Sequence, residues 1–127
     1  MHPIWLDPHV LLSLHNQLIN EYGGLEGLRD TNLLESALMR PQHLLIYENP
    51  SIFELAAAIT YGIVKNHPFL DGNKRTAFMA AYIFLVRNGY TPSMSEIEVV
   101  VMMRKAAASE ISEAELAKWF SENYKTI

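Results

Sequence analysis

The strongest constraint on the fold of this chain is a pair of apolar segments separated by a short polar one. Apolar side chains cover nearly every helical face of residues 51–66, SIFELAAAITYGIVKN, and of residues 73–89, NKRTAFMAAYIFLVRNG. A helix that is apolar all round has to be buried all round. The sequence therefore predicts two central helices rather than surface ones.

Local signals predict where further helices begin and end. A first helix has Asp7 as its N-cap and Pro8 at its first position, and it ends at Gly23 and Gly24. A serine followed three residues later by a glutamate forms a capping box at the start of three later helices. These pairs are Ser51 with Glu54, Ser95 with Glu98, and Ser112 with Glu115.

The segment between the first and third helices is expected to contain a second helix followed by a loop. A second helix is predicted from about Asn32, with Glu35 at capping-box distance, and it stops before Pro41. Residues 41–50, PQHLLIYENP, lie between prolines and are expected to form an ordered loop. No segment alternates with period two. The prediction is one all-α domain over residues 1–127, a compact bundle of about six helices in which two central apolar helices flank the polar loop.

Composition excludes several classes of function. The chain has no cysteine, which removes thiol catalysis, thiolate metal sites and disulfides. Its formal charge of −4 argues against direct nucleic-acid binding, which depends on cations that neutralise phosphates. The first ten residues, MHPIWLDPHV, lack the features of a signal peptide, and no apolar run approaches the length of a membrane span. We therefore expect a cytoplasmic protein with no membrane partner.

The polar segment NHPFLDGNKRTA, residues 66–77, contains the candidate chemistry. It joins the two central helices and runs into the start of the second, where backbone N–H groups lack partners and the helix dipole is positive. Gly72 permits a tight backbone, so the amides from Gly72 through Asn73 to Arg75 can converge on an anion. Lys74 and Arg75 add two positive charges to this phosphate site.

A carboxylate and an imidazole complete the set. Asp71 alone would repel a phosphate, but Mg²⁺ removes this conflict because it binds one or two carboxylates together with substrate phosphates and water. His67 carries an imidazole, which can take up a proton near neutral pH. These are the groups needed to move a phosphoryl or a nucleotidyl group onto a hydroxyl.

Each of these residues also has an ordinary structural interpretation. Taken alone, His67 would more often be a structural histidine, Asp71 a turn residue and Asn73 a helix cap. Lys65 either adds to the cationic rim or simply extends into water from the end of its helix. Their combination in one loop between two apolar helices favours a functional site.

HPFLDGNKRTA closely resembles the motif of the Fic/Doc family, His-x-Phe-x-Asp/Glu-Gly-Asn-x-Arg. YGGLEGLRDTNLLESAL and FELAAAITYGIVKNHPF also resemble the corresponding stretches of the Doc (death-on-curing) branch. The resemblance implies that His67 activates the target hydroxyl and that Asp71 is associated with Mg²⁺. It implies that Gly72, Asn73 and Arg75 hold phosphate.

Two departures from the AMP-transferring Fic pattern point to the Doc branch. The glycine expected after the asparagine is Lys74, and the position of a second arginine is Phe78. A lysine occupies space where nucleotide phosphates would approach, and a phenylalanine cannot pair with a phosphate. The Doc resemblance implies that ATP binds in a reversed orientation and that its γ-phosphate is transferred to a threonine of elongation factor Tu, which stops translation.

The sequence lacks a segment that restrains many Fic enzymes, a helix of the form Ser/Thr-x-x-x-Glu-Gly/Asn. The two candidate pairs, Glu48-Asn49 and Glu122-Asn123, have a leucine and a lysine at the required position. The Doc resemblance implies restraint by a separate antitoxin of the Phd type, whose disordered tail folds as a helix in a groove. Two alternatives stay open: a Fic-type AMP transferase, and a catalytically inactive module that acts by binding a partner.

Overall fold

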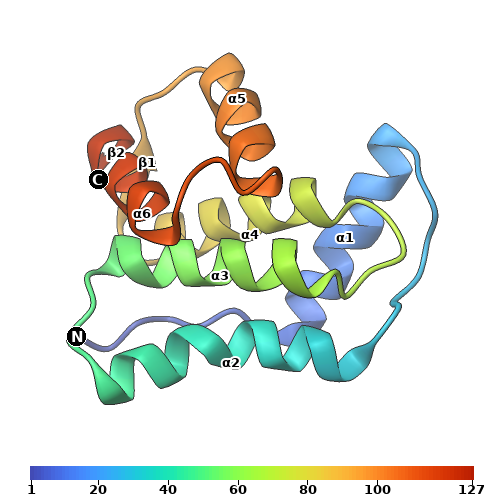
Figure 1. Ribbon diagram of the computed structural model, residues 1–127, viewed down its shortest axis with the longest axis horizontal. Coiled ribbons are helices and arrows are strands. Elements are labelled where there is room, and N and C mark those ends of the chain that lie inside the picture. Colours follow the sequence, from blue (N-terminus) through green and yellow to red (C-terminus); the bar gives the residue numbers. More distant parts are fainter.

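The computed structural model describes the backbone of residues 1–127 and every side chain except that of Ala107. In chain order its elements are α1 (Pro8–Tyr22), α2 (Thr31–Tyr47), α3 (Ile52–Asn66), α4 (Asn73–Arg87), β1 (Tyr90–Pro92), α5 (Glu96–Ala107), α6 (Glu113–Asn123) and β2 (Tyr124–Thr126) (Figure 1). The predicted all-α bundle of about six helices is confirmed over these residues. A very small sheet is added to it.

The two apolar segments form the central helices, as predicted. α3 lies between α2 and α4 in Figure 1, and it also packs against α6. Leu55 and Ile63 of α3 are fully buried, as are Phe84 and Leu85 of α4. Burying each such side chain contributes roughly 1.5–3 kcal/mol. The α3–α4 pair therefore forms a rigid base for the loop that joins its two helices.

The predicted caps are present at the helix starts. The Asp7 carboxylate accepts a hydrogen bond from the N–H of His9 at 2.7 Å, and α1 ends at Gly23, whose φ is 84°. Both reciprocal bonds of the capping box are formed at the starts of α3, α5 and α6. A cap of this kind stabilises a helix by typically ~1 kcal/mol.

The start of α2 differs slightly from the prediction. The helix begins at Thr31 rather than near Asn32, because the side chain of Asp30 is its N-cap. The Asp30 carboxylate accepts from the N–H of Leu33 at 3.1 Å. Asp and Asn are about equally good caps, and the sequence analysis did not consider Asp30.

The prediction of a loop over residues 41–50 is wrong for residues 41–47, because α2 continues through Pro41 to Tyr47, and only residues 48–50 lie outside the helix. Pro41 has no N–H to donate, which normally weakens a helix interior. Its side chain is buried, however, and Leu44 and Leu45 in the next turn pack against the core. Burial of this apolar turn offsets the missing hydrogen bond.

β1 and β2 form an antiparallel pair that the sequence analysis did not anticipate. Tyr90 pairs with Thr126, and Pro92 pairs with Tyr124. Strands of three residues are too short to show an alternating pattern. The pairing places the last residues of the chain beside the end of α4.

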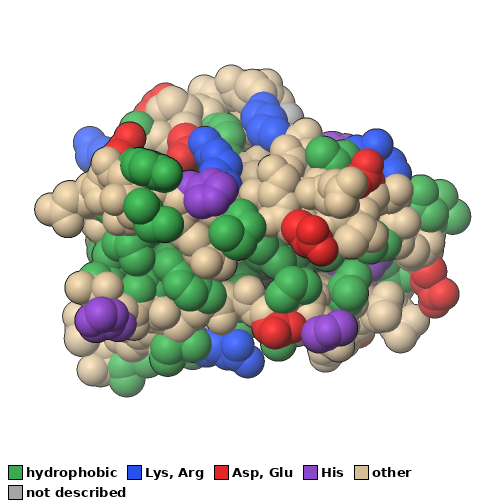
Figure 2. Space-filling view, turned by 90° about the horizontal axis from the view of Figure 1, so that it is seen from below, with side chains coloured by type: hydrophobic (Ala, Val, Ile, Leu, Met, Phe, Trp, Pro, Cys, Tyr) green, Lys and Arg blue, Asp and Glu red, His purple; other side chains and the backbone are tan. Residues whose placement is uncertain are grey.

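The outer face of α2 is partly apolar. Figure 2 shows the molecule from below, the side on which α2 lies in Figure 1, and apolar side chains gather there with separate charged ones between them. Met39, Ile46 and Tyr47 are exposed on this helix.

Over the described residues, no helix has both the length and the apolar character that crossing a membrane requires.

Candidate active site

The polar segment forms the loop between α3 and α4, and it begins with an uncommon backbone conformation at His67. His67 follows the last residue of α3 and has φ 50° and ψ 57°, in the left-handed region that residues with a Cβ seldom adopt. Its N–H donates to the carbonyl of Ile63 at 3.1 Å and closes the helix. The residue is exposed and lines the cleft described below.

α4 begins without a side-chain cap. Gly72 is its N-cap residue, with φ 74°, and no side chain among the described residues bonds the amides that follow. The first hydrogen bond of the helix runs from the N–H of Thr76 to the carbonyl of Gly72. The N–H groups of Asn73, Lys74 and Arg75 come before it and have no acceptor within the helix. Such a helix start is suited to an anion.

Asn73 holds the loop closed with its side chain. Its Oδ1 accepts from the N–H of Phe69 at 3.0 Å, and its Nδ2 donates to the carbonyl of Phe69 at 3.0 Å. Nδ2 also lies 3.4 Å from Nδ1 of His67. That distance is beyond the usual hydrogen-bond range, so it does not fix the tautomer of the imidazole. The side-chain amide thus bonds the loop, and the backbone N–H of Asn73, which has no acceptor within the helix, is available to an anion.

Asp71 presents an ionised carboxylate at the cleft. Its Oδ2 accepts from the N–H of Leu25 at 3.1 Å, and its Oδ1 accepts from the N–H of Gly72 at 2.9 Å. These two bonds, with that of Leu25 the larger cause, lower the pKa of Asp71 below its usual value. A Cβ placed on Gly24 would lie 2.7 Å from Oδ2 of Asp71. The backbone at Gly24 therefore lies so close to this carboxylate that only glycine fits there.

The connector between α1 and α2, residues 23–30, runs along the motif loop. The N–H groups of Arg29 and Asp30 both donate to the carbonyl of Pro68, at 2.6 and 3.1 Å. The N–H of Leu70 donates to the carbonyl of Gly27 at 3.1 Å. Leu28 and Phe69 form an isolated antiparallel bridge. The connector therefore fixes the loop through backbone bonds along most of its length.

His15 of α1 supports the loop from inside the protein. Its side chain is 1% exposed, and its Nε2 lies 2.7 Å from the carbonyl oxygen of Asp71. Its ring stacks on Phe69 with a centroid separation of 3.8 Å and an angle of 6° between the planes. Because the carbonyl can only accept, the Nε2 donates this bond.

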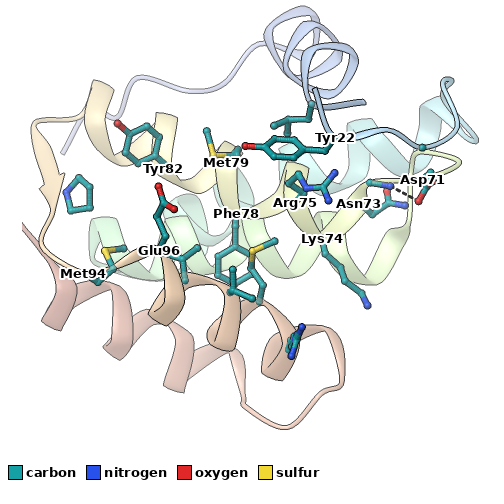
Figure 3. Close-up of a pocket in the computed structure, with 18 of the residues that line it drawn as sticks. Tyr22, Asp71, Asn73, Lys74, Arg75, Phe78, Met79, Tyr82, Met94 and Glu96 are labelled. Carbon is teal, nitrogen blue, oxygen red and sulfur yellow. Dashed lines mark hydrogen bonds between the residues drawn. The ribbon is translucent and has the colours of Figure 1, made fainter. Parts of the chain in front are cut away.

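The motif residues His67, Asp71, Gly72 and Asn73 border one cleft of about 1400 Å³ (Figure 3). Lys74 and Arg75 lie at one end of it, and Glu96 and Tyr82 lie at the other. The guanidinium of Arg75 lies 4.5 Å from the ring centre of Tyr22, a cation–π contact that orients it. The rest of the lining is mainly apolar, and it includes Phe78, Met79, Met94, Val99, Met103 and Trp119.

Of the residues predicted for the site, Lys65 is placed elsewhere. Its Nζ donates to the hydroxyl of Ser109 and lies 5.6 Å from the ring centre of Tyr61. Tyr61 belongs to α3 and Ser109 follows α5, and Lys65 is not among the described residues that line the cleft. The cations that line the cleft are thus Lys74, Arg75 and Arg104, and the side chain of Lys65 connects α3 to the segment after α5.

The donor set at Asp71 fits a magnesium ion that arrives with phosphate. Among the described residues, no group of three or more His, Cys, Asp or Glu side chains is positioned to hold a metal. Magnesium commonly binds through one or two carboxylates and takes its other ligands from substrate phosphates and water. An ionised Asp71 beside a helix start suited to phosphate meets that requirement, whereas a resident metal site would need more protein ligands.

His15, Tyr22 and Arg29 contribute to the site but were missed by the sequence analysis. Each lies far along the chain from the motif, and each acts through a contact that only the folded chain brings together. The segment YGGLEGLRD contains Tyr22 and Arg29. Its glycines and its resemblance to the Doc branch were the features that could have indicated a role for this segment.

The fold and this loop define a member of the Fic/Doc family. A sequence model of the Fic/Doc family matches residues 5–85, and the chain belongs to that family. Among characterised relatives, the chain is 35% identical over 117 residues to the protein kinase doc of Escherichia phage P1, covering 88% of this chain and 89% of the relative. It is 41% identical over 70 residues to the toxin Doc of Mycolicibacterium smegmatis, covering 54% of each chain. The chain is therefore a Doc-type member of the family.

Proposed function

We propose that this protein is an ATP-dependent protein kinase that transfers the γ-phosphate to a serine or threonine hydroxyl of a protein, with His67 as the base. One observation carries the proposal. The uncapped start of α4, the cations of Lys74 and Arg75, the carboxylate of Asp71 and the imidazole of His67 all border the same cleft. The phage P1 relative is a protein kinase by name, which supports the same assignment.

In the proposed reaction, an unprotonated nitrogen of His67 takes the proton of the target hydroxyl. The hydroxyl oxygen forms a bond to the γ-phosphorus as the bond from that phosphorus to the β–γ bridging oxygen breaks, and ADP leaves. A positioned base of this kind contributes ~10²–10⁴-fold to the rate. The amides at the start of α4, together with Lys74 and Arg75, hold the phosphates and balance their charge.

Asp71 would hold Mg²⁺ together with phosphate oxygens of the nucleotide. When bound, the ion neutralises charge on the transferring phosphoryl group. The lowered pKa of Asp71 keeps its carboxylate ionised over the range in which such an ion binds. Gly72 permits the turn that brings this carboxylate and the amides of α4 to the same cleft.

The packing of Phe78 favours γ-phosphate transfer over AMP transfer. The AMP-transferring Fic pattern has an arginine at this position. In this chain the residue is Phe78, which is only 6% exposed and whose ring lies 6.4 Å from that of Phe120. A guanidinium there would be buried against aromatic side chains at considerable cost. The alternative product, an AMP adduct, is distinguished from a phosphate adduct by the intact mass of the modified target.

We propose elongation factor Tu as the protein substrate and a separate antitoxin of the Phd type as the partner that restrains the activity. Both follow from the resemblance to the Doc branch, and the second relative, a toxin, supports the existence of an antitoxin partner. Inhibition of translation in the cytoplasm would follow from phosphorylation of this factor.

The test is to incubate the purified protein and Mg²⁺ with elongation factor Tu and ATP labelled at either the α- or the γ-phosphate. We expect label from the γ-position alone, and a loss of at least about 100-fold in the His67→Ala variant. Label from the α-position would instead identify an AMP transferase. Growth arrest that His67→Ala leaves undiminished on expression would identify an inactive partner-binding module.

A further inference from the structure

The end of α3 is held by one side chain from the α1–α2 connector. The last carbonyls of a helix lack partners within it. At this end, the carbonyl of Asn66 accepts from an Nη2–H of Arg29 at 2.8 Å, and the carbonyl of His67 accepts from its Nε–H at 2.7 Å. One guanidinium therefore bonds two consecutive carbonyls. A cation at a helix C-terminus is also favoured by the helix dipole.

This contact acts on the backbone that aims the His67 side chain. His67 has φ 50° and is one of two residues with a Cβ and a positive φ in the described chain. That conformation is unfavourable for such a residue and persists only where its surroundings hold it. The Arg29 side chain bonds the carbonyl whose direction depends on the His67 ψ angle. It therefore opposes relaxation to the ordinary helical conformation, which would turn the imidazole away.

Arg29 is itself fixed on the loop. Its own N–H donates to the carbonyl of Pro68 at 2.6 Å, and the neighbouring Asp30 donates to the same oxygen. Its backbone and its side chain thus bond three successive residues, Asn66 to Pro68. A surface arginine without a role would have few such ties. Arg29 is not among the described residues that line the cleft, which argues against direct contact with the substrate.

We propose that Arg29 is a positioning residue that holds the imidazole of His67 in the orientation needed for catalysis. This inference rests on the proposed role of His67 as the base. Arg29 acts through the carbonyls of Asn66 and His67 and touches neither the nucleotide nor the hydroxyl. Its loss would change the orientation of the base while leaving the phosphate-binding groups of α4 in place.

The test compares Arg29→Ala, Arg29→Lys and the control Arg87→Ala, which removes an exposed arginine at the other end of α4. For Arg29→Ala we expect kcat for γ-phosphate transfer to fall about 10- to 100-fold, because small displacements of a catalytic group have effects of this size. The KM for ATP should stay within about two-fold, because the phosphate-binding groups are unchanged. Arg29→Lys, which keeps the charge and one donor, should recover part of kcat. Arg87→Ala should resemble the unmodified protein.

A readout independent of activity separates this inference from the proposed function. We expect the amide of His67, which is bonded to the carbonyl of Ile63, to exchange its hydrogen faster in Arg29→Ala while the amides inside α3 exchange as before. If the unmodified protein transfers no phosphate but this exchange still changes, the positioning contact stands and the proposed function fails. If kcat and the exchange are both unchanged, or if kcat falls only in step with a general loss of thermal stability, the inference is wrong.

Discussion

Nε2 of His15 lies 2.7 Å from the carbonyl oxygen of Asp71, a residue 56 positions further along the chain. The donor is buried within α1, and the acceptor belongs to the residue that presents its carboxylate to the cleft. This bond and the stacking of the same imidazole on Phe69 connect the first helix to the motif loop. Together they explain why a histidine, rather than an apolar residue, stands in this part of the core.

The His15→Phe variant tests that connection. Phenylalanine can keep the stacking on Phe69 but cannot donate a hydrogen bond, so the carbonyl of Asp71 loses its partner. We expect the free energy of unfolding, measured by urea titration, to fall by about 1–3 kcal/mol. The matched control is His9→Phe on the exposed side of the same helix, which should change stability by less than about 0.5 kcal/mol. Equal stability of the two variants would show that the buried bond contributes nothing net.

Gly23 and Gly24 offer a matched pair for the close approach to Asp71. Both have positive φ, so alanine is strained at either position. Only at Gly24 would the new Cβ meet Oδ2 of Asp71, at 2.7 Å, whereas nothing lies within 4 Å at Gly23. We expect Gly24→Ala to reduce kcat for γ-phosphate transfer about 10- to 100-fold more than Gly23→Ala does. Equal kcat values for the two variants would contradict the importance of this contact.

Gly62 allows α2 and α3 to pack closely. A Cβ on Gly62 would lie 3.1 Å from Cα and 3.2 Å from the carbonyl oxygen of Ala37, which are backbone atoms that cannot move cheaply. Overpacking of this kind costs about 1–3 kcal/mol, and it opposes the gain of roughly 1 kcal/mol that alanine brings inside a helix. We therefore expect Gly62→Ala to lower the melting temperature in calorimetry.

The exchange of the two side chains provides the control for that packing. Ala37→Gly removes the methyl group that the new Cβ would contact at 3.2 Å, but it leaves the Cα and the carbonyl oxygen in place. The double variant Gly62→Ala with Ala37→Gly should therefore show a smaller loss than the sum of the two single variants. Simple additivity would mean that the two positions do not restrict each other.

Tyr124 makes the stability of the protein sensitive to alkaline pH. Burial, with a smaller effect from Tyr82, raises the pKa of Tyr124 from 10.0 to about 12. The neutral phenol is therefore favoured in the folded state, and its contribution to stability is complete below pH 10. We expect this contribution to be lost as the pH rises from about 10 through 12, as measured by urea titrations at successive pH values. Tyr124→Phe should make stability less dependent on pH over that interval.

The parts of the fold that sequence predicted well depend on short-range chemistry. Ser51 and Glu54 are three residues apart, and the capping box they form needs no other part of the protein. The apolar surface of α3 and α4 likewise predicts burial wherever those helices lie. Pro41 misled the prediction, because the helix-breaking tendency of a proline is local while the burial that outweighs it comes from the surrounding core.

The location of the candidate site could be predicted from the motif, but the residues that support its loop could not. Gly72, Lys74 and Arg75 follow one another at a helix start, so their shared location needed only the position of the helix. Lys65 is close to the motif in sequence, yet its side chain turns to Ser109. Arg29 and His15 are remote in sequence and meet the loop only after the chain folds, so spacing alone could not reveal them.

The bonds that shape the α3–α4 loop come largely from a segment earlier in the chain, residues 15–30. A transplant of residues 66–77 alone into another helical hairpin would therefore carry the side chains of the candidate site without the loop conformation seen here. A working graft would need the end of α1 and the connector as well. For protein engineers, the smallest portable unit is thus a pair of segments that have to be moved together.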